Sequence, residues 1–217
     1  MTWDWSYALA ILPRLMVGIW CTILVTLASS AIALTAGLLL SILESVSTTL
    51  GRALLRFLLE VFRGVPILVL LYFAFYVLPE VGLTFPAMPV GIGVLGTVYA
   101  AFCSEAYRGS LITIPAELRD ACLVLHLSPY TKWRRVLIPL MIKRAAPALL
   151  NYVFALFRAS AFLFAIGVPV LLGEAQVAGY ESFRYLEPFT LAGVFYMLMN
   201  LPFLYLLPRF KDKYSGI

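Results

Sequence analysis

Charged residues are scarce in this chain. Asp, Glu, Lys and Arg make up 12% of its 217 residues, whereas about a quarter is usual for a soluble domain. Hydrophobic residues make up 63%, so the composition excludes an ordinary soluble fold and predicts an integral membrane protein. The 16 basic residues outnumber the 11 acidic ones, but the excess stands in short runs beside apolar segments. Orientation in a membrane explains that pattern, so nucleic-acid binding is not expected.

Histidine and cysteine are equally scarce, with one histidine and three cysteines in the whole chain. The lone His126 cannot by itself supply a metal site or a catalytic triad. Cys21, Cys103 and Cys122 stand in no metal or redox spacing, so we interpret them as small apolar fillers. The sequence has no GxxxxGK(S/T) motif, so any energy source must be another chain or an ion gradient. We therefore expect no catalytic residue, no metal and no cofactor on this chain.

Long uncharged runs predict an all-α membrane protein, with five membrane-spanning helices in a single domain that covers residues 1–217. The first run is the clearest, because residues 15–43 contain no acidic, basic or histidine side chain. About 20 residues suffice for a helix to cross the hydrocarbon core. We expect the spans at about residues 15–43, 57–79, 86–108, 145–172 and 188–208.

Most of the basic residues fall on one side of this five-span arrangement. They are Arg52, Arg56, Arg63, Arg108, Arg119, Lys132, Arg134, Arg135, Lys143, Arg144, Arg209, Lys211 and Lys213. By the positive-inside rule, that side is the cytoplasm. We therefore expect the N-terminus outside the cell, and both the C-terminus and residues 115–139 in the cytoplasm.

Residues 115–139 form the one long polar interval in the chain. Apolar residues recur between its charged ones at roughly helical spacing, which predicts two short amphipathic helices. We expect the break between them at Ser128-Pro129, because serine at the N-cap and proline at the first helical position start helices. Two interpretations are open: an ordinary basic loop between spans, or a docking element for a cytoplasmic partner.

Arg158 is the one charged residue inside the fourth predicted span. It lies roughly 21 Å along a helix from Arg144, near the bilayer middle, where a charge costs about 2.5–3.5 kcal/mol. Its side chain should therefore face water or protein. Arg158 is either a residue of the substrate path or gate, or an arginine satisfied by carbonyl groups at a subunit interface.

Two acid–base pairs with the same spacing stand at the cytoplasmic ends of spans two and three. They are Glu60 with Arg63, and Glu105 with Arg108. Residues three apart share a helix face, so each pair can form a local ion pair that contributes tenths of a kcal/mol. Such pairs are common at helix ends, and from the spacing alone we favour this structural interpretation.

Gly91, Gly93 and Gly96 match the GxGxxG pattern of dinucleotide-binding proteins. That motif acts between a strand and a helix, whereas here it lies inside an apolar span. We interpret these glycines, and likewise Ala33 and Gly37, as small residues that let membrane helices approach closely.

Two stretches resemble signatures of the membrane-spanning subunits of bacterial ABC importers, in the branch for polar amino acids and opines. The segment EVFRGVP at residues 60–66 is similar to the ExFRGxP signature that enters that family's second span. Residues 99–111 are similar to its AYxxExxRGxI segment. The resemblance implies structural or gating roles for Glu60, Arg63, Gly64, Pro66, Arg108 and Gly109.

The polar interval resembles the EAA loop of the same family, whose short coupling helix docks on the ATPase. Residues 120–122, 126–128 and 138–139 follow the spacing of that loop. His126 stands where the family has glycine, so we expect the helix to run through this point. With Leu125 and Leu127 as apolar anchors, the resemblance assigns ATPase docking to Asp120, Ala121, Leu125, His126 and Leu127.

In span four, the family often has Lys-Asp-Thr-Ser, whose acid is thought to help hold a substrate amino group. The matching residues here are Arg158, Ala159, Ser160 and Ala161. Because Ala159 provides no acid, we expect a heterodimer in which the second permease subunit holds the substrate amine. The resemblance places Arg158, Ser160 and Glu105 along the substrate path.

The resemblance implies a type I ABC importer permease fold in the bacterial inner membrane and a complex of several proteins. Two copies of an ATPase, which carry ATP and Mg, would dock from the cytoplasm. A second permease subunit would complete the path, and a periplasmic or lipid-anchored binding protein would deliver the solute. The chain itself would contact membrane lipid and would not be an enzyme.

The leading hypothesis is therefore a permease subunit of an ATP-driven importer. Amino acids, opines and other small polar solutes all fit such a subunit. The alternatives are a stand-alone secondary transporter or channel, and a membrane assembly protein. Five spans without an inverted repeat fit a stand-alone transporter poorly. A stand-alone transporter also needs no loop for docking an ATPase. An assembly protein needs no Arg158 facing a cavity.

Overall fold

The computed structural model describes the backbone of residues 3–214 and the side chains of residues 3–118 and 120–205. Within that range it consists of helices without a strand, which confirms the all-α prediction. The elements are α1 (Trp5–Val46), α2 (Thr49–Gly64), α3 (Ile67–Tyr72), η1 (Phe73–Val77), η2 (Leu78–Val81), α4 (Ala87–Ile112), α5 (Ala116–Val124), α6 (Pro129–Thr131), η3 (Lys132–Leu137), α7 (Ile138–Ala159), η4 (Ser160–Ile166), α8 (Leu171–Ser182) and α9 (Leu186–Tyr214). Both chain termini, and the side chains of Arg119, Arg209, Lys211 and Lys213, lie outside the described part.

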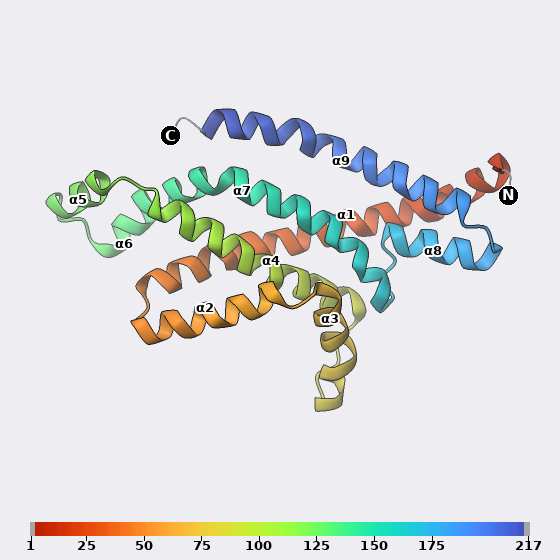
Figure 1. Cartoon of the computed structure of the whole chain (residues 1–217), viewed down its shortest axis with the longest axis horizontal. Helices are drawn as coiled ribbons and strands as arrows, with labels where there is room; N and C mark the ends of the chain where they lie inside the picture. Colours follow the sequence, from red (N-terminus) through yellow and green to blue (C-terminus); the bar gives the residue numbers. More distant parts are fainter. Residues whose placement is uncertain (1–2, 215–217) are drawn as a thin grey trace.

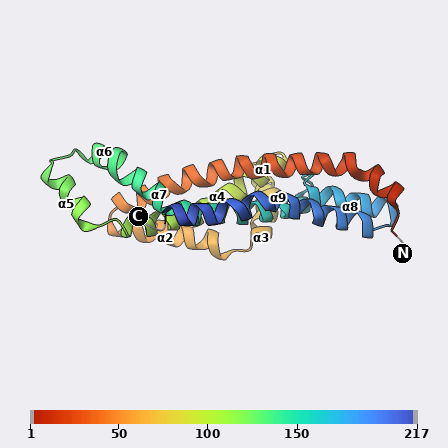
Figure 2. The same cartoon turned by 90° about the horizontal axis from the view of Figure 1, so that it is seen from above.

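Helix α1 runs almost the whole length of the molecule, and α4, α7 and α9 lie along it (Figures 1 and 2). Asp4 caps its start by accepting hydrogen bonds from the backbone N–H groups of Ser6 and Tyr7. The Ser6 hydroxyl, and then the Tyr7 N–H, hold the pKa of Asp4 below its usual range. The main core lies between α1, α3, α4 and α7, around the fully buried side chains of Val25, Leu71, Leu95 and Met141.

Four helical runs in the described part of the chain are long and apolar enough to cross a membrane. They are Trp5–Val46, Ala87–Ile112, Pro129–Ile166 and Leu186–Tyr205. A fifth crossing requires Thr49–Gly64 and Ile67–Val81 to act as one broken span. This count agrees with the predicted five-span arrangement, whereas the limits of each span within the membrane stay a prediction.

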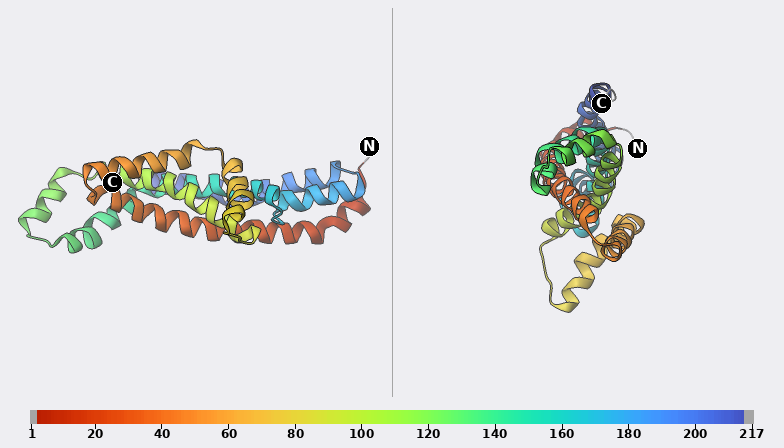
Figure 3. Two further views of the ribbon diagram at one scale, coloured as in Figure 1. Left: turned by 90° about the horizontal axis from the view of Figure 1, so that it is seen from below. Right: turned by 90° about the vertical axis from the view of Figure 1, so that its left-hand side faces the viewer.

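The second predicted span, at residues 57–79, is sharply bent. Helix α2 ends at Gly64, Val65 is extended with ψ 132°, and the next helical segment leaves at 100° to α2. Pro66 explains this break, because proline has no N–H to continue a helix and disfavours helical geometry in the residue before it. The arm formed by α3, η1 and η2 therefore projects from the side of the bundle (Figures 1 and 3).

The helix of the fourth predicted span, at residues 145–172, begins earlier than expected. As predicted, Ser128 caps a helix start, and its hydroxyl accepts a 3.3 Å hydrogen bond from the N–H of Thr131. From Pro129 the helix continues through α6, η3, α7 and η4 to Ile166, so the second helix of the polar interval is not short. Gly167, in the left-handed region with φ 81°, ends this run.

Small residues bring the long helices into close contact, as the sequence predicts. A Cβ added at Gly37 would lie 2.6 Å from the Cβ of Cys103, so α1 and α4 touch there. Additions at Gly91 and Gly96 would collide with Leu163 and Ile32. The GxGxxG pattern is therefore a packing surface, in which only its middle glycine faces open space.

Gly37→Ala is expected to lower the stability of the chain by about 1–3 kcal/mol, because α1 and α4 must separate to admit the methyl group. Gly93→Ala is the matched control. No atom lies within 4 Å of a Cβ at that position, and alanine favours a helix over glycine by about 1 kcal/mol. Thermal unfolding of the full chain in detergent measures both changes, and equal shifts in Tm would contradict this account of the packing.

Candidate functional site

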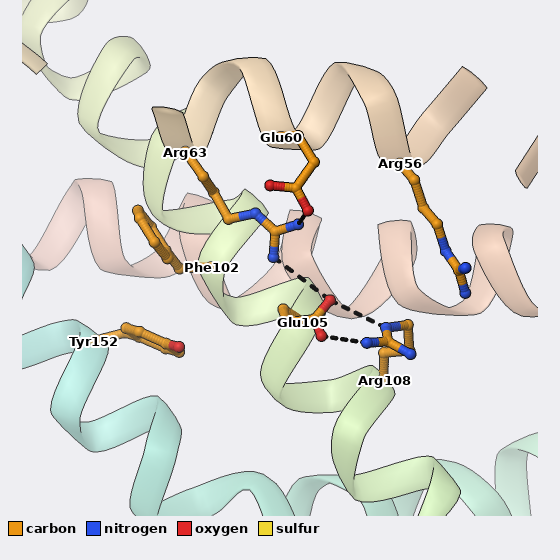
Figure 4. Close-up of a pocket in the computed structure, with 7 residues that line it drawn as sticks. All are labelled: Arg56, Glu60, Arg63, Phe102, Glu105, Arg108 and Tyr152. Carbon is orange, nitrogen blue, oxygen red and sulfur yellow. Dashed lines mark hydrogen bonds and ion pairs between the residues drawn. The ribbon is translucent and has the colours of Figure 1, made fainter. Parts of the chain in front are cut away.

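A charged pocket opens near the C-terminal ends of α2 and α4, with α7 on its third side (Figure 4). Its volume is about 570 Å³. The two signature pairs, which lie far apart in the sequence, meet in its wall. The lining residues are Arg56, Glu60, Arg63, Phe102, Glu105, Arg108 and Tyr152.

Six side chains from α1, α2 and α4 form a continuous chain of alternating charge at this pocket. Their order is Arg56, Glu44, Arg108, Glu105, Arg63 and Glu60. The nitrogen–oxygen distances in that order are 2.6 Å, 4.0 Å, 3.0 Å, 3.4 Å and 2.7 Å. Three arginines meet three glutamates, so the chain of charges is neutral as a whole.

The local pairs predicted within α2 and within α4 are both confirmed. In the described part of the chain, the direct ionic link between these two helices is the 3.4 Å contact between Arg63 and Glu105. Arg63 also pairs with Glu60 on α2, and Glu105 also pairs with Arg108 on α4. The helices can therefore separate here without leaving a charge alone, which would be costly in a membrane.

Glu44 is, with Arg56, one of two residues of this network that the sequence did not reveal. It is 4% exposed, pairs with Arg56 and Arg108, and its backbone oxygen accepts a hydrogen bond from Arg52. As the acid that follows the first uncharged run, Glu44 was visible in the sequence. Its partners come from two other helices, however, and no spacing rule connects them.

The glycines of the two signatures are not needed for packing within this subunit. A Cβ at Gly64 or at Gly109 would meet no atom within 4 Å. Pro66, by contrast, sets the bend that follows α2. The gating roles of the two glycines stay a prediction.

The polar interval lies at the end of the molecule opposite the start of α1 (Figures 1 and 2). Helix α5 ends at Val124, and His126 takes the left-handed region with φ 48°. The expectation that the helix runs through His126 is therefore wrong. The backbone keeps a turn that suits glycine, and histidine adopts it at a steric cost.

His126→Gly is expected to stabilise the chain by roughly 1 kcal/mol. The left-handed conformation costs a non-glycine residue about 1–2 kcal/mol, and the extra freedom of glycine in the unfolded state offsets part of that gain. His126→Ala is the control, because it removes the imidazole and keeps the strain. Thermal unfolding should show a gain for glycine alone, and an equal gain for alanine would assign the effect to the imidazole instead.

The end of α5 presents apolar side chains to open space. Leu123, Val124 and Leu125, which we name the apolar tip, are 64%, 78% and 68% exposed. Asp120 and Ala121 are exposed on the same short helix. An exposed apolar patch on a polar loop marks an interaction surface.

The predicted docking residues divide into two groups. Asp120, Ala121, Leu125 and His126 are exposed and available to a partner. Leu127 is half-buried and lines a hollow of about 400 Å³ at the base of the loop, together with Trp133 and one side of Leu123. The sequence did not reveal Leu123 or Val124 as docking residues, although both continue the apolar run that ends α5.

Arg158 stands exposed on the surface of the isolated chain, with its guanidinium 5.1 Å from the ring centre of Phe154. No ion pair or hydrogen bond joins its side chain to any other described residue. It lines a hollow of about 360 Å³ between α7 and α9, together with Phe157, Ala161, Tyr196, Met197 and Asn200.

The three residues predicted along the substrate path do not meet in one place. Glu105 lines the charged pocket, whereas Arg158 lines the hollow beside α9. Ser160 is fully buried, and its hydroxyl donates a 2.6 Å hydrogen bond to the carbonyl of Phe157. Among the described residues, no group of three or more His, Cys, Asp or Glu side chains could hold a metal ion.

Known proteins match this chain over nearly its whole length. A family model described as binding-protein-dependent transport system inner membrane component matches residues 33–215. The probable amino-acid ABC transporter permease protein y4tG of Sinorhizobium fredii is 31% identical over 92% of this chain and 89% of that protein. The glutamine transport system permease protein GlnP of Escherichia coli is 28% identical over 98% of both. A solved structure, described as an amino acid ABC transporter with histidines, superposes with a TM-score of 0.88 at 27% identity over 98% of this chain and 100% of the other.

Proposed function

Because the chain belongs to the family of binding-protein-dependent transport system inner membrane components, we propose that it is the permease subunit of an ATP-driven importer of amino acids or related small polar solutes. Its likeness to the solved amino acid ABC transporter confirms the predicted permease fold. The observation that carries the proposal is the apolar tip of α5, at the end of a loop that resembles a coupling loop. A stand-alone transporter or channel has no use for such a tip.

ATP hydrolysis, in this proposal, takes place on two copies of a separate ATPase that bind ATP and Mg. The absence of a P-loop motif from the sequence supports this assignment. The apolar tip and Asp120 contact the ATPase, and the helix that runs from Pro129 to Ile166 connects that contact with the membrane. The contact must differ between two states of the ATPase, since equal binding to both could drive no change.

A second, different permease subunit completes the path. Support comes from Ala159, which is 6% exposed and stands where the family often has the acid that holds a substrate amine. Arg158, exposed and without an ionic partner in the described part of the chain, can bind a carboxylate. Purification of an active transporter with two copies of this chain and no second permease would contradict the heterodimer.

The subunit lies in the bacterial inner membrane with α5 in the cytoplasm. The distribution of basic residues supports this orientation. The start of α1 and the end of α8 lie together at the opposite end of the molecule, where a binding protein would deliver the solute (Figure 1).

Reconstitution in liposomes tests the proposal. The full chain, its second permease, the ATPase and a binding protein are assembled, and uptake of radiolabelled L-glutamine and L-arginine is measured with and without ATP. We expect uptake that needs both ATP and the ATPase. Uptake by the permease subunits alone, driven by an ion gradient, would favour a stand-alone transporter.

A further inference from the structure

The charged pocket holds hydrogen-bonding groups that its own ion pairs leave unused. The Nε of Arg63 is buried and has no hydrogen-bond partner in the described part of the chain. Its two terminal nitrogens are engaged by Glu60 at 2.7 Å and Glu105 at 3.4 Å. A buried N–H without a partner is costly, and a carboxylate that displaces the exposed Glu60 from this edge of the guanidinium could accept this hydrogen bond.

The pocket also has groups that can bind the ammonium group and the side chain of a small zwitterion. The Glu60 carboxylate is 69% exposed, so an ammonium group can reach it. Phe102 and Tyr152 pack with ring centres 5.5 Å apart and form an aromatic floor below Arg63 (Figure 4). The volume of about 570 Å³ lies within the roughly 300–1,000 Å³ that is usual for small-molecule sites.

We propose that this pocket is a binding site for zwitterionic α-amino acids of net charge zero, on the cytoplasmic side of the transport path. The substrate carboxylate accepts from Nε of Arg63, the ammonium group lies near Glu60, and the side chain packs on Phe102 and Tyr152. The assignment rests on the proposed function, and it narrows the class of solute that the site accepts.

The net charge of the site determines that class. The pocket is lined by Arg56, Arg63 and Arg108 and by Glu60 and Glu105, and the buried Glu44 behind the lining pairs with two of these arginines, so the site as a whole is neutral. A zwitterion adds one charge of each sign and keeps the balance. A basic or acidic amino acid adds a third charge without a partner, which is unfavourable in a partly buried site.

The test is saturation-transfer NMR on the full chain in lipid nanodiscs, with L-glutamine, L-arginine and L-glutamate as probes of charge zero, plus one and minus one. We expect L-glutamine to bind at least roughly tenfold more tightly than the other two. Arg63→Gln should reduce L-glutamine binding by a similar factor, since it removes the carboxylate donor.

Variants that change the net charge of the pocket test the proposal more directly. If the charged residues only stabilised the fold, these variants would not change which of the three amino acids binds most tightly. Glu60→Gln gives the pocket a charge of plus one and should shift the preference toward L-glutamate. Arg56→Gln gives it minus one and should shift the preference toward L-arginine. Glu80→Gln, which lies in η2 outside the pocket, is the control and should keep the native order.

Equal binding of the three probes, no binding of L-glutamine, or the same preference in all variants would overturn the assignment. The assay contains no ATPase, so its outcome is separate from that of the proposed function. ATP-driven uptake with an unchanged preference in Glu60→Gln and Arg56→Gln would refute the site and leave the importer in place. Charge-dependent binding without ATP-driven uptake would support the site and contradict the proposed importer.

Discussion

Val124→Asp is expected to weaken binding of the ATPase roughly 10- to 100-fold and to abolish ATP-driven transport. Val124 is 78% exposed in the isolated subunit, so its burial in a groove of the ATPase would contribute about 1.5–3 kcal/mol, which aspartate loses. The side chain belongs to no core cluster of the described residues, so the subunit should fold as before. Co-purification with the ATPase and ATP hydrolysis in nanodiscs measure the effect.

Val124→Ile is the matched control, since it keeps the apolar contact, and it should retain binding and transport. Asp120→Lys reverses a charge on the same helix and tests whether an ionic contact accompanies the apolar one. If Val124→Asp and Asp120→Lys both bind the ATPase as the native chain does, residues 115–139 are only a basic loop between spans.

Local signals in the sequence predicted the start of the second helix of the polar interval but not the turn that precedes it. Ser128-Pro129 combines an N-cap with a rigid first helical residue, and these preferences act within a few residues, so the structure follows them. The turn at His126 depends instead on a backbone conformation that histidine disfavours. Residue preference alone therefore predicted a continuous helix.

The bend in the second span was not predicted, although Pro66 was visible in the sequence. The uncharged run from residue 64 to residue 79 suggested one membrane-spanning helix, whereas the structure has two helical segments that can still form one broken span. Proline can break a helix through sterics and a missing donor, yet Pro13 and Pro147 lie inside α1 and α7. Pro66 therefore marked a candidate break in the sequence, and the extended backbone at Val65 is what makes it an actual one.

The sequence predicted the ion pairs within each helix of the charged pocket, but it did not predict that these pairs meet in one network. The pairs Glu60–Arg63 and Glu105–Arg108 follow from helical spacing, which the sequence carries. Their meeting with Glu44 depends on how α1, α2 and α4 pack, and small residues such as Gly37 set that packing. Spacing within one helix contains no information about which other helix lies opposite.

Arg158→Leu is expected to reduce ATP-driven uptake roughly 10- to 100-fold, because it removes a charge-assisted contact to the solute that is worth about 1.5–3 kcal/mol. The same change should leave the thermal stability of the subunit nearly unchanged. A guanidinium that faces a water-filled path is hydrated, and its contact with the Phe154 ring is worth only about 0.5–1 kcal/mol at an exposed site. Uptake should therefore fall without a matching fall in stability.

The stability of the assembled transporter separates the two interpretations of Arg158. If carbonyl groups of the second permease satisfied the guanidinium, leucine would leave those carbonyls unpaired, and the assembled transporter would lose stability together with activity. If the residue faces a water-filled path, the protein keeps its stability and loses only transport. Arg158→Lys is the control, since it keeps the charge, and it should retain more uptake than leucine. A fall in both quantities for Arg158→Leu would assign the arginine to the subunit interface and remove it from the substrate path.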